Sequence, residues 1–437
     1  MAGDTRGALG AGGLAIFYRS GRSQGCFYFL KPPAPIAPLN GNLDLEQSLD
    51  CDVLIVGGGP AGLACAAQLP AHFSCLVVHQ DAEIGKPVRT SGGSWVADLQ
   101  TLGVPDHLYQ VIDEIEIRSD NQRSLHQMQR HKMAVLDITG TYQWLADLAR
   151  AAGADIRTGA KFLSTVVKGD TQVSQVRFKG EGTRAIRSKY LIDASGTPRA
   201  VLSALDLGKR AERVGVGIEY EYEIEEAPMN RAVLFVGQPV LKGYGWIFPA
   251  PNNHLRIGVG VIQPDTVISP RDIMEPLLTP AFLDSYGLKL GKRIAVSAGI
   301  IPSEPYDPRL VFDRVIRVGD SANIATPTVG EGIRLAIEMG RDLGQRLCDV
   351  KDQGSPAPLA LYQRRWRKRF MLQYLFGFWA NRKIARYGVA QWDKSIARVA
   401  RMSESQLAAL IRCELPLNRM LSAAWSQLKA RVCAWFS

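Results

Sequence analysis

The feature that most constrains the fold is a run of glycines between an apolar strand and a helix. Residues 51–56 read Cys-Asp-Val-Leu-Ile-Val, a short β-branched run that predicts a buried parallel strand. Gly57-Gly58-Gly59-Pro60-Ala61-Gly62 follows and fits the pattern GxGxxG. Residues 60–71 are then predicted as a helix and residues 74–79 as a second strand. This order is a βαβ unit and indicates an α/β fold.

The strand, glycine turn and helix together predict a dinucleotide site. Gly57 permits a tight turn, Gly59 lets the backbone approach a pyrophosphate, and Gly62 lets helix and strand pack closely. The helix that begins at Pro60 and Ala61 then directs free N–H groups and a positive dipole end at the phosphates. An acid that binds the ribose is expected about twenty residues further on. His79 stands at that position, with Asp81 and Glu83 close behind as substitutes.

Composition places the chain among globular proteins. It has 437 residues, of which 46% are hydrophobic and 22% charged, and no apolar run approaches the length of a membrane-spanning helix. The seven cysteines are scattered, with no CxxC spacing. That pattern argues against a disulfide framework or a metal site, and predicts a reduced compartment such as the cytoplasm. Residues 1–49, which include a proline-rich stretch, are predicted as a disordered extension, with an organelle-targeting segment as the alternative.

Segments far downstream resemble one known family. Leu191-Ile-Asp193-Ala-Ser-Gly196 and Val318-Gly319-Asp320-Ser-Ala322 are similar to the D-A-x-G and G-D-A segments of FAD-dependent oxidoreductases of the p-hydroxybenzoate hydroxylase superfamily. Pro327-Thr-Val-Gly330-Glu331-Gly332-Ile333 resembles the P-x-x-G-E-G-I segment of the same proteins. One departure is Arg199, which stands where the family usually has a serine.

The geranylgeranyl reductase branch of that superfamily is the most similar. Gly85-Lys-Pro-Val-Arg89-Thr-Ser91-Gly92-Gly93 resembles the loop after the second strand, with Ser91-Gly92 where the branch often has Cys-Gly. Tyr244-Gly-Trp246-Ile-Phe248-Pro249 resembles the Y-x-W-x-F-P signature of prenyl reductases. Read without the resemblance, these three aromatic residues alternate and fit one apolar face of a core strand.

The resemblance implies FAD as cofactor and assigns roles along the chain. Asp320 would hold the ribityl hydroxyls, and the backbone from Pro327 to Gly332 would lie along the isoalloxazine ring. Arg89 would lie beside the flavin, and Tyr244, Trp246 and Phe248 would wall the substrate cavity. The remaining residues that the resemblance implies for the cofactor site are Gly92, Asp193, Gly196, Gly319 and Gly330. We interpret Glu331 as a carboxylate that caps the helix predicted over 330–348 rather than as a general acid.

The expected architecture is therefore a Rossmann-like FAD-binding domain with a parallel sheet, assembled from about 50–110, 135–205 and 295–350. A smaller substrate domain with an antiparallel sheet would take about 111–134 and 206–294, and residues 351–437 would form basic C-terminal helices. For single segments, the sequence predicts a helix near 142–151, alternating strands in 155–193 and 214–262, and a strand over 310–318.

The function that the resemblance implies is reduction of carbon–carbon double bonds in an isoprenoid or related lipid. Because no second GxGxxG appears, the electrons would come from transiently docked NAD(P)H or from a donor protein such as reduced ferredoxin. Alternatives are a flavin monooxygenase that hydroxylates an aromatic compound or polyketide, and a lycopene-cyclase-like enzyme without net redox change. A flavoprotein that only relays electrons is the non-enzymatic alternative.

The basic C-terminal part indicates an anionic partner. The chain carries a formal charge of +10, and no acid interrupts 354–392. Eight cations fall there: Arg364, Arg365, Arg367, Lys368, Arg369, Arg382, Lys383 and Arg386. Six aromatic residues are interleaved with them: Trp366, Phe370, Tyr374, Phe376, Phe378 and Trp379. A basic helix with aromatic residues favours a peripheral site on a membrane surface. Nucleic acid is not expected, because no recognition motif accompanies the charge.

Overall fold

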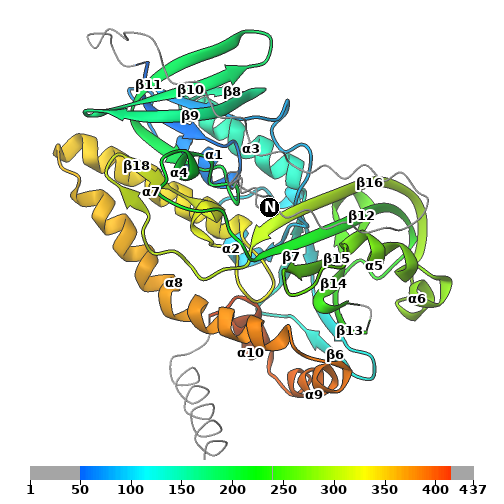
Figure 1. The fold of residues 1–437 in the computed structure, drawn as a ribbon. Coiled ribbons are helices and arrows are strands. Elements are labelled where there is room, and N and C mark those ends of the chain that lie inside the picture. The colour runs from blue at the N-terminus through cyan, green and yellow to red at the C-terminus, as the bar shows by residue number, and fades with distance from the viewer. Residues whose placement is uncertain (1–49, 239, 415–437) are drawn as a thin grey trace, which may run out of the picture. The chain divides into compact units, whose positions relative to one another are not determined.

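The computed structural model describes residues 50–238 and 240–414, which build two large β-sheets, a small one and a group of helices (Figure 1). The expectation for residues 1–49 lies outside the described residues, as does the end of the predicted C-terminal helical region. The helices of the described part are α1 (Pro60–Ala66), α2 (Val96–Thr101), α3 (Ile138–Ala151), α4 (Ala200–Ala204), α5 (Pro270–Leu277), α6 (Pro280–Ser285), α7 (Ile333–Gln353), α8 (Ala357–Ile384), α9 (Val389–Val399) and α10 (Glu404–Ile411).

The first sheet carries the predicted dinucleotide motif. Its strands are β1 (Cys51–Val56), β2 (Cys75–Val78), β8 (Asp155–Arg157), β9 (Ala160–Lys168), β10 (Thr171–Phe178), β11 (Gly182–Asp193), β17 (Val311–Phe312) and β18 (Val315–Arg317). The order is β17-β18-β11-β1-β2-β8, with parallel pairing from β18 to β8 and with β10 and β9 added antiparallel beside β11. The predicted parallel sheet is confirmed.

One strand of this sheet differs from the prediction. The run over 310–318 forms two short antiparallel strands, β17 and β18, because Asp313 turns the chain with a φ of +56°. Aspartate tolerates this left-handed conformation better than most residues. The charged pair Asp313 and Arg314 interrupts the apolar pattern of this segment, and the prediction of a single strand overlooked this turn signal.

Helices α1 and α7 pack so closely that glycine is required between them. A Cβ atom added at Gly340 of α7 would lie 2.2 Å from the carbonyl oxygen of Ala61, and one at Gly344 would lie 2.5 Å from that of Cys65. This contact joins α1 to the middle of α7, although the two helices lie far apart in the sequence.

The second sheet is mainly antiparallel, in the order β16-β12-β15-β14-β13-β5-β6. Its strands are β5 (Glu114–Arg118), β6 (Arg123–Gln127), β12 (Val214–Glu226), β13 (Arg231–Gly237), β14 (Val240–Ala250), β15 (His254–Gln263) and β16 (Lys289–Pro302). The small third sheet has the order β3-β7-β4. It consists of β3 (Gly93–Trp95), β4 (Tyr109–Ile112) and β7 (Met133–Leu136). The separate antiparallel sheet expected from the sequence is confirmed.

The long helix α8 runs beside α7 and ends near α9 and α10, next to the second sheet (Figure 1). Three of its aromatic residues face α7 and the core: Trp366, Phe370 and Tyr374 are at most 3% exposed. The Trp366 indole donates to Asp342, and the Tyr374 hydroxyl donates to the carbonyl of Ile324. Their assignment to a membrane-facing side is therefore wrong, because tertiary packing takes them inward. No helix in the described ranges is both long and apolar enough to cross a bilayer.

Candidate active site

The glycine motif forms a cradle in which one glycine is not needed by the protein itself. Gly57 has a φ of +121°, and a Cβ there would lie 2.2 Å from the carbonyl oxygen of Ala194. A Cβ at Gly62 would lie 2.2 Å from the Gly57 carbonyl oxygen. At Gly59, directly before α1, a Cβ would meet no atom within 4 Å. The open space beside Gly59 and the start of α1 is where a pyrophosphate fits.

His79 and Asp81 follow β2, where an acid that binds the ribose is expected, and both side chains have partners within the protein. Nδ1 of His79 accepts a hydrogen bond from the Gly58 amide at 3.2 Å, so the histidine supports the glycine turn. Asp81 forms a two-pronged ion pair with Arg89, with nitrogen–oxygen distances of 2.7 and 3.1 Å. Asp81 and Arg89 therefore orient each other at the edge of the cradle. His79 is largely buried, and this burial lowers its pKa, which favours the neutral ring as acceptor.

Asp320, near the glycine motif, is a carboxylate that forms no ion pair with any cation of the described residues. Its Oδ1 accepts one hydrogen bond, from the amide of Ala325 at 3.2 Å, and burial raises its pKa to about 6. Gly319 brings it close to α1, since a Cβ there would lie 2.9 Å from that of Ala61. Such an acid gains from hydroxyl groups that donate to it.

Asp193 and Gly196 shape the neighbouring loop. The fully buried Asp193 carboxylate accepts hydrogen bonds from the amides of Ser195, Val201 and Leu202 and from the Ser195 hydroxyl. These bonds satisfy the first amides of α4 and fix the turn after β11. Asp193 therefore acts on the site through the backbone of this turn, and both carboxylate oxygens are already in use.

An apolar cavity of about 560 Å³ lies between the second sheet, two loops and the C-terminal helices. The loop after β2 contributes Arg89 and Gly92 to its wall, and the loop before α7 contributes Pro327, Gly330 and Gly332. The second sheet contributes Tyr244, Trp246 and Phe248 to its wall. Their rings follow one another along β14, with centroids 5.6 and 6.5 Å apart.

The aromatic wall is held in place by polar contacts. The Tyr244 hydroxyl donates to the carbonyl of Val329, in the loop before α7. The Trp246 indole crosses Gly258 of the next strand and donates to Glu219 on β12, at 2.6 Å. A Cβ at Gly258 would lie 2.2 Å from the indole ring, so this position needs glycine. The rings of Tyr244 and Trp246 thus have fixed orientations.

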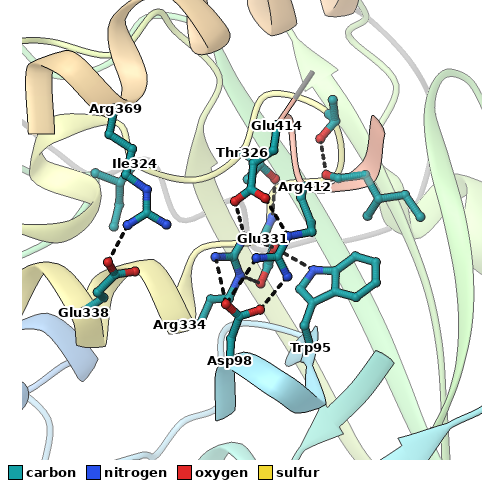
Figure 2. A network of polar contacts seen from close by, with 12 residues as sticks. Trp95, Asp98, Ile324, Thr326, Glu331, Arg334, Glu338, Arg369, Arg412 and Glu414 are labelled. Atoms are coloured by element: carbon teal, nitrogen blue, oxygen red, sulfur yellow. Dashed lines mark hydrogen bonds and ion pairs between the residues drawn. The ribbon is translucent and has the colours of Figure 1, made fainter. Parts of the chain in front are cut away.

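A buried charge network supports the loop before α7 (Figure 2). Glu331 accepts from Arg334 at 2.5 Å and from the Trp95 indole at 3.3 Å. Arg412, after α10, pairs with Asp98 of α2 and lies over the Trp95 ring. Because α7 begins at Ile333 with Gly332 as its N-cap residue, the interpretation of Glu331 as a helix cap is wrong. It is an ion-pair partner of Arg334 and also accepts a hydrogen bond from Trp95, which ties the loop to β3.

Comparison with known proteins shows which cofactor the chain binds. Residues 50–373 match the family described as FAD binding domain. The chain belongs to this family. FAD is its cofactor, and the resemblance drawn from the sequence is confirmed.

Several curated relatives of this FAD-binding chain share one name. The digeranylgeranylglycerophospholipid reductase of Haloferax volcanii is 27% identical over 88% of this chain and 98% of its own length. The enzyme of the same name from Picrophilus torridus is 24% identical, over 83% of this chain and 94% of its own length.

The solved structures show the same fold. A geranylgeranyl bacteriochlorophyll reductase-like protein from Thermoplasma acidophilum superposes with a TM-score of 0.73, at 22% identity, over 83% of this chain and 95% of its own. The p-nitrophenol 4-monooxygenase of Pseudomonas putida superposes with a TM-score of 0.67, at 18% identity, over 84% and 96%. The fold therefore serves both reductases and monooxygenases.

The residues present fit FAD on two grounds internal to the protein. Gly59 leaves open space beside the start of α1, and Asp320 has acceptor capacity that no side chain of the described part satisfies. We propose that the pyrophosphate lies on the Gly57–Gly62 turn, that Asp320 holds the ribityl hydroxyls, and that the flavin ring lies beside Pro327–Gly332 on the wall of the apolar cavity.

Two parts of the site were missed in the sequence. Glu219 belongs to a run in which Glu219, Glu221 and Glu223 alternate, the pattern of a solvated strand face. The sequence predicts only basic helices for the C-terminal part, yet Asn381, Ile384, Trp392 and Ile396 line the cavity. Neither feature has a local signal, because both depend on which elements cover the second sheet.

Proposed function

We propose that this FAD-dependent oxidoreductase saturates carbon–carbon double bonds of a membrane isoprenoid lipid. The observation that carries the proposal is the apolar cavity, which extends from the loop before α7 along the aromatic wall to the C-terminal helices. Its volume lies within the roughly 300–1,000 Å³ of small-molecule sites. The names of the curated relatives support a prenyl substrate.

Reduced FAD supplies hydride chemistry when it is bound. The protein must then hold an isolated alkene against that chemistry and keep water away. Tyr244 and Trp246 do this with fixed aromatic faces, since each ring is anchored by a hydrogen bond at its polar end. Ile384 and Ile396 complete the cavity wall with apolar side chains. A prenyl chain gains free energy by leaving water and packing against them.

The exposed side of α8 supports a site at a membrane surface. Five apolar side chains stand out from it: Leu361, Met371, Leu372, Leu375 and Trp379, the last 60% exposed. Six cations of α8 and the turn after it make no ion pair within the described ranges: Arg364, Arg367, Lys368, Arg382, Lys383 and Arg386. Arg365 and Arg369 instead pair with Glu338 and Asp342 of α7. Unpaired cations beside exposed apolar residues favour anionic lipid headgroups.

The deciding experiment is anoxic turnover. Purified holoenzyme is chemically reduced, mixed with a geranylgeranyl lipid in detergent, and the lipid is analysed by mass spectrometry. A reductase adds two hydrogen atoms per saturated bond without oxygen. Product that requires oxygen and gains an oxygen atom would show a monooxygenase instead. Unchanged product mass with altered retention would show a cyclase without net redox change, and flavin reoxidation without any product would show an electron carrier.

The same assay with NAD(P)H or reduced ferredoxin in place of the chemical reductant identifies the donor.

A further inference from the structure

One carboxyl group on the cavity wall is not explained by FAD binding. Glu219 of β12 is 4% exposed and lines the apolar cavity. The only other acid among the described lining residues is Glu331, which Arg334 holds with two hydrogen bonds. Glu219 is thus the acid of this wall with no cation in hydrogen-bond contact.

The Glu219 carboxyl group is fixed by neutral donors. The Trp246 indole donates to Oε2 at 2.6 Å, across Gly258. The Ser91 side chain also hydrogen-bonds to the carboxyl group, from the loop that precedes β3. With Oε2 occupied by the indole, Oε1 is the oxygen that carries a proton in the acid form.

The charge of Glu219 is only partly compensated by the charged groups around it. On β15, Arg256 Nε lies 3.9 Å from Glu219 Oε1 but 3.3 Å from Glu221 Oε2, and its Nη1 donates to the backbone carbonyls of Ser91 and Leu136. Glu221, on β12 itself, adds a like charge. On β14, Tyr244 stays neutral because burial raises its pKa. On β16, the residue paired with Glu219 is the uncharged Ser297.

Burial therefore has the largest effect on this acid. It raises the pKa of Glu219 above the ordinary value of 4.5, and the attraction of Arg256 only partly offsets it. A buried acid whose neutral form is favoured, and which faces an apolar cavity, has the properties of a general acid.

We propose that Glu219 is the proton donor in alkene reduction, an inference that rests on the proposed function. Glu219 gives its proton to one alkene carbon while the other carbon receives hydride from the reduced flavin. The π bond is replaced by two C–H bonds, so the alkene is reduced, the flavin is oxidised and a carboxylate remains. Water returns a proton to Glu219 after the product leaves.

The first test reads Glu219 without any turnover. The indole N–H resonance of Trp246, assigned by its loss in W246F, is followed by NMR while the pH of the oxidised holoprotein is varied. We expect one transition above the ordinary range of a glutamate, and a flat profile in E219Q. In the matched control E221Q the transition persists but moves to lower pH, because a like charge has been removed. A wild-type resonance that does not titrate, or one that titrates unchanged in E219Q, overturns the assignment.

The second test measures single turnovers of reduced enzyme under anoxia. E219Q should retain FAD and bind the lipid, but saturate the alkene about 100- to 10,000-fold more slowly, the usual contribution of a general acid. E219D keeps an acid at this position and should restore part of the rate. An E219Q rate within a few-fold of wild type refutes the role of Glu219 alone. A wild type that reduces no prenyl alkene refutes the proposed function, and the titration still reports on Glu219.

Discussion

Gly59 is the glycine of the turn for which we expect the cofactor, and not the fold, to require the missing side chain. In Gly59→Ala the new Cβ enters space in which no protein atom lies within 4 Å, with φ at −89°, which any residue adopts. The apoprotein should keep its stability to within about 0.5 kcal/mol, as for a surface substitution. The same Cβ occupies the space assigned to the pyrophosphate. Crowding of this kind costs about 1–3 kcal/mol, which corresponds to roughly 5- to 150-fold weaker FAD binding.

Gly57→Ala is the matched control, because its Cβ would lie 2.2 Å from a carbonyl oxygen and its φ is +121°. It should destabilise the apoprotein as well as weaken FAD binding. Unfolding in urea measures apoprotein stability, and quenching of flavin fluorescence measures FAD affinity. Gly59→Val extends the series and should leave the purified protein colourless. A Gly59→Ala protein that binds FAD as tightly as wild type, or whose apoprotein is as unstable as Gly57→Ala, would refute the assignment of this space to the pyrophosphate.

Three further predictions test other parts of the protein. Burial raises the pKa of Asp320 from 3.8 to about 6, so the folded apoprotein binds a proton that the unfolded chain has lost, and stability should fall as pH rises from about 4 to 6. Asp320→Asn should flatten this slope in urea unfolding and weaken FAD binding; an unchanged slope would contradict the assigned cause. Burial opposes ionisation of Asp98, but the hydrogen bond from Arg412 and the charge of Arg334 outweigh it and lower its pKa. Arg412→Ala should therefore cost about 1–3 kcal/mol at neutral pH, and the difference from wild type should shrink as pH falls below about 4; a constant difference would show that Arg412 acts by packing alone. Finally, R364Q/R367Q/K368Q should weaken binding to anionic liposomes, measured by cosedimentation, by about 100-fold, at about 1 kcal/mol per cation. The control K161Q/R177Q/K179Q removes three exposed cations at the β9–β10 hairpin and should leave this binding unchanged. Equal effects of the two variants would contradict the proposed membrane site.

The sequence was sufficient for features that depend on neighbours along the chain. A β-branched run followed by Gly57–Gly62 specifies the strand, turn and phosphate-binding helix, since each residue acts on backbone a few positions away. The downstream motifs around Asp320 and Pro327 were recognisable for the same reason. Alternation along residues 244–248 placed three aromatic side chains on one face of a strand, although the alternation itself did not say what that face meets.

Tertiary structure decided everything that depends on what covers a surface. The pattern of Glu219, Glu221 and Glu223 is that of a solvated strand, yet Glu219 is buried because the Ser91 loop and the Trp246 indole lie over that position. The sequence predicts a membrane-facing Trp366, but its indole packs against α7 and donates a hydrogen bond to Asp342. Burial sets both the pKa of an acid and the role of an aromatic ring, and burial is a property of segments brought together from distant parts of the chain.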